Sequence, residues 1–127
     1  MAFDCREGFS FRLSGHLRVV IAELPGSPTQ VLVVYLTTKK ENSDTTVVLK
    51  SGDHNFIKHD TVVSYADSRI FDKDDLIDRI ERKLFKPDKP FDIEKVRIMQ
   101  RGLLDSPYTP KAIKDLYRKA SQNNNPN

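Results

Sequence analysis

Two of the chain's three histidines lie in one short polar stretch, Ser51–Asp60, together with a lysine and two aspartates. Histidine is the side chain whose ordinary pKa lies nearest neutrality, so two histidines can share the roles of general acid and general base. So many polar groups are costly to bury, and loops held on a rigid scaffold often carry chemistry. The stretch therefore predicts an acid–base site, and a polar surface turn is the alternative that fits the same composition.

Other kinds of chemistry have less support. The spacing of His54 and His59 is not the i, i+4 helical spacing of a zinc protease, and a single cysteine excludes a multi-cysteine zinc site. No glycine-rich run opens a helix that would cradle a phosphate. Cys5 lies near the N-terminus, which we expect to be mobile, and is not interpreted as a nucleophile. The sequence therefore predicts neither a metal nor a cofactor.

The composition is typical of one small domain. The chain has 127 residues, of which 38% are hydrophobic, enough for a modest core but without cysteines for an internal disulfide. No secretory pattern is visible, and the longest apolar run, Val31–Leu36, is too short to span a bilayer. We therefore expect a cytoplasmic protein with no membrane partner.

The residues up to Phe71 have the pattern of short β-strands, with alternating or short apolar runs and clear turn signals between them. The predicted strands are Phe9–Leu13, Leu17–Glu23, Val31–Leu36, Thr45–Leu49, Thr61–Tyr65 and Arg69–Phe71. Five or six short strands at this spacing favour a small, strongly curved antiparallel β-barrel.

The pattern after Phe71 is helical. Leu76, Ile77, Ile80 and Leu84 share one face of a first helix, and Lys86–Pro90 is predicted to be a linker. A second helix is expected to begin near Asp92, and a third has Thr109 as its N-cap and Pro110 at its first position. We thus expect residues 1–85 to form the barrel with its following helix, and residues 86–127 a helical C-terminal extension packed on the same single domain.

Three motifs in order resemble the MazF/PemK toxin family. They are Gly15–Ile21, a turn containing a histidine that leads into an apolar strand; Val33–Thr38, a strand that ends in a Thr-Thr pair; and Val47–Gly52, a short strand that ends in a Ser-Gly turn. The segment Asp60–Phe71 and the amphipathic helix after it resemble the last strands and terminal helix of the family. The resemblance covers roughly residues 8–84.

The resemblance implies a specific fold and activity. The family has a small SH3-like barrel with a terminal helix, usually as a homodimer, and its members are neutralised by a cognate antitoxin protein. They are metal-independent endoribonucleases that cut single-stranded RNA by attack of the ribose 2′-hydroxyl, leaving a cyclic phosphate. Such a site needs a base, an acid and donors or positive charge for the phosphate.

The sequence departs from the family at the catalytic arginine, which directly follows the histidine of the turn. Leu17 occupies that position here, and Arg18 comes one residue later, which in a strand sends its side chain to the opposite face. A bulge at Ser14-Gly15 would restore the arginine. The family's threonine corresponds to Thr37 or Thr38, with Thr38 preferred because it is nearer the loop.

The residues present predict a site that differs from that of the family. His16 and either His54 or His59 are expected to divide the acid and base roles, with Arg18 or Lys58 holding the phosphate. Phe56 and Ile57 are expected to anchor the loop. The candidate catalytic residues are His16, Arg18, Thr38, His54 and His59. The candidate RNA-binding residues are Lys50, Lys58 and Tyr65, with a core position as the alternative for Tyr65.

A second hypothesis follows from Leu17: the same barrel could be a catalytically silent module that binds RNA or a protein partner. The net charge of +3 comes from residues 71–127, because residues 1–70 carry equal numbers of basic and acidic side chains. The footprint of this module would be the basic residues of the last two predicted helices, for which a solvated helix face is the alternative. They are Lys95, Arg97, Arg101, Lys111, Lys114, Arg118 and Lys119.

Overall fold

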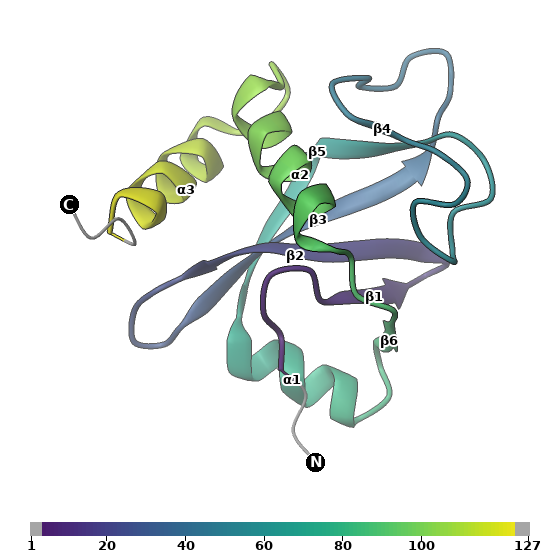
Figure 1. Cartoon of the computed structure of the whole chain (residues 1–127). Helices are drawn as coiled ribbons and strands as arrows, with labels where there is room; N and C mark the ends of the chain where they lie inside the picture. The colour runs from purple at the N-terminus through teal and green to yellow at the C-terminus, as the bar shows by residue number, and fades with distance from the viewer. Residues whose placement is uncertain (1–3, 124–127) are drawn as a thin grey trace.

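The computed structural model describes residues 4–123, which form one antiparallel sheet and three helices (Figure 1). The strands are β1 (Ser10–Leu13), β2 (His16–Leu24), β3 (Gln30–Thr38), β4 (Val48–Leu49), β5 (Thr61–Asp72) and β6 (Lys86–Asp88). The helices are α1 (Lys73–Glu81), α2 (Ile93–Asp105) and α3 (Lys111–Asn123).

The sheet is a curled half-barrel with the strand order β4-β5-β3-β2-β1-β6. All of its pairings are antiparallel, as predicted, and the edge strands β4 and β6 do not pair with each other in the described chain. The protein therefore belongs to the small α+β class, with an open sheet at its centre.

The strand β5 unites two segments that were predicted to be separate strands. On β3, Val33 pairs with Arg69 and Tyr35 pairs with Ser64. More residues of β5 than of β3 therefore lie between these two pairs, and the extra β5 residues form a bulge. Residues 66–68, which separate the two predicted strands, lie in that bulge. A bulge adds local bend and twist without ending the strand.

Alternation along the strands gives the sheet two apolar faces. One face, carrying Leu17 and Val19 among others, packs against α2 and α3 through Met99, Leu103 and Ala120, and we call it the α2/α3 face. The opposite face packs against α1 through Leu76 and Ile80, and we call it the α1 face. Figure 1 shows α1 on one side of the sheet and α2 with α3 on the other. Each strand residue is thus assigned to a face by its position in the alternation.

Two predictions for residues 84–88 were wrong. Residues 86–88, predicted as a linker, form β6 and pair with β1, with Pro87 opposite Phe11. Proline has no N–H to donate to a neighbouring strand. Pro87 is tolerated because β6 is an edge strand, with a neighbour on one side only. Leu84, predicted to lie on the buried face of the first helix, is 63% exposed because α1 ends at Glu81.

The C-terminal helices follow the predicted pattern with one difference. The side chain of Asp92 caps α2 by accepting a hydrogen bond from the amide of Lys95 at 3.0 Å. The third helix begins at Lys111, one position later than expected, with the carbonyl of Pro110 accepting from the amide of Lys114. Thr109 is therefore not the N-cap, and its buried hydroxyl has no hydrogen-bond partner among the described residues.

The α2 helix lies very close to the sheet at Gly102. A Cβ atom at that position would lie 2.5 Å from Cγ2 of Val47 and would also collide with the ring of Tyr65. Glycine is therefore required there by the close packing of helix on sheet.

Cys5, predicted to lie in a mobile terminus, is fully buried with Phe11 and Leu76 in the core beneath the α1 face. Burial raises the pKa of its thiol from 9.0 to about 11, although Lys73 acts in the opposite direction. Within the described part of the chain, no helix has both the length and the apolar character needed to cross a membrane.

Candidate functional site

A pocket of about 280 Å³ lies where three segments distant in the sequence come together. They are the first residues of β2, the last residues of β3 and the loop between β4 and β5. Its lining includes His16, Thr37, Thr38, Lys58 and His59. Three of the five predicted catalytic residues, His16, Thr38 and His59, therefore meet in one place.

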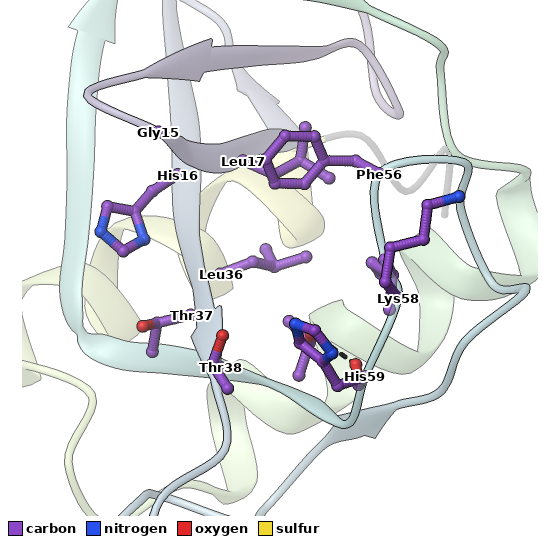
Figure 2. Close-up of a pocket in the computed structure, with 11 residues that line it drawn as sticks. Gly15, His16, Leu17, Leu36, Thr37, Thr38, Phe56, Lys58 and His59 are labelled. Atoms are coloured by element: carbon purple, nitrogen blue, oxygen red, sulfur yellow. Dashed lines mark hydrogen bonds between the residues drawn. The ribbon is translucent and has the colours of Figure 1, made fainter.

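Figure 2 shows how these side chains surround the pocket. The polar side chains follow one rim, from His16 through Thr37 and Thr38 to His59, and Lys58 lies on the far side from His16. Phe56 and Leu17 form the opposite rim, and Leu36 lies between the two rims. The pocket thus has a polar rim with two imidazoles and an apolar wall.

The position of His16 is set by a tight hairpin between β1 and β2. Ser14 and Gly15 have positive φ values of 55° and 78°, as the two central residues of a type I′ turn require. The pairing around them is regular, with Leu13 opposite His16 and Phe11 opposite Arg18. No bulge is present at Ser14-Gly15, so the arrangement that would have restored the family's arginine does not occur.

Leu17 and Arg18 accordingly lie on opposite faces of the sheet. Leu17 is 1% exposed and belongs to the core of the α2/α3 face. The guanidinium of Arg18 lies 4.8 Å from the ring centroid of Tyr35, which alternation assigns to the α1 face. Arg18 is not among the pocket-lining residues, so Lys58 is the cationic side chain that lines the pocket.

Two residues, Asp53 and Ile57, fix the loop that carries Lys58 and His59. The carboxylate of Asp53 accepts from the amide of Lys50 at 2.7 Å and pairs with Lys95 of α2 at 3.2 Å. The bond from Lys50 and the charge of Lys95 lower the pKa of Asp53, although burial acts the other way. Ile57 is 3% exposed and anchors the loop in the core, as predicted, whereas Phe56, predicted to do the same, is 36% exposed.

His54 lies away from the pocket and has a structural environment. It is 6% exposed, and its ring stacks on Phe91 with the centroids 4.6 Å apart. Its Nε2 lies 2.5 Å from the carbonyl oxygen of Lys89, and its Nδ1 accepts from the amide of Phe56 at 3.0 Å. These partners assign the proton to Nε2 and leave neither nitrogen free for a substrate.

His16 and His59 differ from His54 in this respect. Neither ring has a hydrogen-bond or ion-pair partner within residues 4–123. The ring of His16 packs on Tyr35 with a centroid distance of 4.8 Å, which orients it without using its nitrogens. The backbone carbonyl of His59 accepts from the hydroxyl of Thr61 at 3.0 Å, which fixes the chain there and leaves the ring free. Both imidazoles can therefore exchange protons with a bound molecule.

Two of the predicted RNA-binding residues lie outside the pocket. Tyr65 is fully buried and donates its hydroxyl to the carbonyl of Met99 at 2.8 Å, so its side chain does not reach the surface. Lys50 is exposed but pairs with Asp60 at 2.9 Å, and its hydrogen bond lowers the pKa of that carboxyl. Only Lys58 of that group lines the pocket.

Tyr35 and Thr61 were not singled out from the sequence. Tyr35 contacts both His16 and Arg18, and Thr61 adds a hydroxyl to the pocket. Alternation predicts that Tyr35 points away from the face of Val34 and Leu36, but its neighbours on β2 follow only from the strand register.

The described residues contain no group of three or more His, Cys, Asp or Glu side chains able to hold a metal ion. The fold and pocket together define a small α+β protein with a curled antiparallel sheet and a two-histidine pocket at one end of it. No family model, curated protein or solved structure matches this chain.

Proposed function

We propose that the protein is a metal-independent endoribonuclease that cuts single-stranded RNA in this pocket. One observation carries the proposal: His16 and His59, whose ring nitrogens have no partners among residues 4–123, line one pocket with threonine hydroxyls and a lysine. Two imidazoles can supply a base and an acid near neutral pH. A lysine and hydroxyl donors suit a phosphodiester.

The reaction needs two proton transfers and no added reagent. One histidine removes the proton of the ribose 2′-hydroxyl as its oxygen attacks phosphorus, and the other donates a proton to the 5′-oxygen as the P–O bond breaks. The products are a 2′,3′-cyclic phosphate and a 5′-hydroxyl. Lys58 and the hydroxyl of Thr38 stabilise the charge that develops on the non-bridging oxygens.

The MazF/PemK resemblance supports the same class of reaction. The His16 turn and the Thr37-Thr38 strand end, which carry the resemblance, both contribute to the pocket. The SH3-like character of the half-barrel, a cognate antitoxin and a homodimer belong to this proposal and rest on the resemblance alone.

A second candidate function is a catalytically silent module that binds RNA. Leu17 favours it, because this residue is buried where the family has its catalytic arginine. The helical footprint predicted for such a module is weakened by ion pairs. Lys95, Arg97, Lys111 and Arg118 all pair with carboxylates.

The test is incubation of the purified protein with a long, mostly single-stranded RNA in EDTA, followed by analysis of the product ends. The nuclease predicts cuts that leave 2′,3′-cyclic phosphates and 5′-hydroxyls. RNA that stays intact across a range of pH but is bound in a salt-dependent manner would instead support the silent module.

A further inference from the structure

A row of cationic and aromatic side chains leads away from the pocket on the α1 face of the sheet. We call His16, Arg18, Tyr35 and Arg69 the basic strip. The ring of Tyr35 lies 4.8 Å from both the ring of His16 and the guanidinium of Arg18. Arg69 lies on β5 opposite Val33, two residues from Tyr35 on β3 and on the same face. The strip thus begins at the pocket and crosses three strands.

The two arginines of the strip lack the partners that most other arginines of this chain have. Arg6, Arg12, Arg82, Arg97 and Arg118 all form ion pairs. Within residues 4–123, Arg18 and Arg69 form neither an ion pair nor a side-chain hydrogen bond, and Nε of Arg18 is buried without a partner. Asp67, the carboxylate whose charge acts on Arg18, accepts a hydrogen bond from Ser64 at 2.7 Å.

The guanidinium of Arg18 is partly desolvated and lies near the positive charge of Arg69. Burial lowers the pKa of its guanidinium and the positive charge of Arg69 lowers it further, while Tyr35 and Asp67 act in the opposite direction. A buried donor without a partner is also costly. An anion placed near both arginines offsets the repulsion between their charges.

We infer that the basic strip binds the phosphodiester backbone of the single-stranded RNA beside the phosphate that is cut. The inference rests on the proposed function for its ligand. The strip begins at His16, which also lines the pocket, so one strand of RNA can occupy both. Arg18, whose guanidinium lies over the ring of Tyr35, presents a planar set of donors suited to phosphate.

The experiment measures fluorescence anisotropy of a short, fluorescein-labelled 2′-O-methyl oligouridine, which cannot be cut by 2′-hydroxyl attack. The primary variant is Arg69→Gln, which removes an exposed charge with little risk to folding. The control is Lys86→Gln, because Lys86 is also exposed, has no side-chain partner within residues 4–123 and lies on β6, an edge strand that does not neighbour β5. Arg18→Lys keeps the charge but removes the planar group.

We expect Arg69→Gln to weaken binding roughly three- to tenfold and to reduce the slope of log affinity against log salt by about 0.7, the value for one phosphate contact on a single strand. Arg18→Lys should also weaken binding, and Lys86→Gln should leave it unchanged. Equal effects of Arg69→Gln and Lys86→Gln, or no effect of either, would overturn the strip. Equally tight binding of a labelled oligoglutamate would also overturn it and would assign the surface to an acidic protein segment.

The outcomes separate the strip from the nuclease. Binding that depends on Arg69 without any cleavage of unmodified RNA contradicts the proposed activity but supports the strip. Cleavage by a protein whose oligonucleotide affinity is unaffected by Arg69→Gln supports the activity and overturns the strip.

Discussion

Leu17 and Arg18 are neighbours in the chain, but β2 places their side chains on opposite faces of the sheet. Leu17 is packed in the core and forms part of the apolar wall of the pocket, whereas Arg18 lies over Tyr35 outside it. The regular hairpin at Ser14-Gly15 fixes this register. A nuclease built on this fold therefore depends on His16, His59 and Lys58, and cannot use an arginine at the position of Leu17.

Leu17→Arg tests that dependence. The substitution puts a cation where the leucine is 1% exposed in the apolar core, and we expect it to lower the free energy of unfolding by roughly 3–5 kcal/mol. Urea denaturation followed by circular dichroism measures this loss. A stable Leu17→Arg protein that cuts RNA faster than the wild type would show instead that an arginine at this position can take part in catalysis.

The two histidines of the loop should differ in their contribution to stability. His54→Ala removes the acceptor of the Phe56 amide and the stack on Phe91, so we expect a loss of about 1–3 kcal/mol. His59→Ala removes an exposed ring without partners in the described chain, so its effect should stay within about 0.5 kcal/mol. Equal unfolding midpoints for His54→Ala and the wild type would contradict the structural role of His54.

The thiol of Cys5 should be unreactive in the folded protein. Burial raises its pKa to about 11, so the thiol stays protonated at pH 8, and only the thiolate reacts with iodoacetamide. We expect mass spectrometry to show slow alkylation of the native protein at pH 8 and rapid alkylation in denaturant. Because the folded pKa is the higher one, Cys5 also favours the folded state less as the pH rises from 9.0 towards 11. Rapid alkylation of the native protein would contradict the buried position.

Much of the secondary structure could be predicted from local patterns. Short apolar runs predicted β2 and β3, and the Asp92 cap with its following periodicity predicted α2. The errors occurred where non-local pairing overrides local sequence. Pro87 suggests a linker, yet Lys86–Asp88 completes the sheet beside β1, and residues 66–68 remain inside β5 because the bulge accommodates them.

Only part of the site could be predicted, because local sequence does not show which side chains the fold brings together. The turn at His16, the Thr37-Thr38 strand end and the polar loop are local signals, and the fold brings them to one pocket. The sequence left His54 and His59 as alternatives, since both are histidines of one loop. Only the tertiary contacts separate them, because His54 is held by Lys89 and Phe91, more than thirty residues away.

The most direct test of the two-histidine site is the rate at which one single-stranded RNA is cut in EDTA by the wild type, His16→Ala and His59→Ala. We expect cleavage by the wild type and rates lower by roughly 10²–10⁴-fold in each variant, the usual contribution of a general acid or base. Circular dichroism of the same samples checks that the variants are folded. Folded variants that cut at the wild-type rate, or a wild type that leaves the RNA intact, would contradict the two-histidine site.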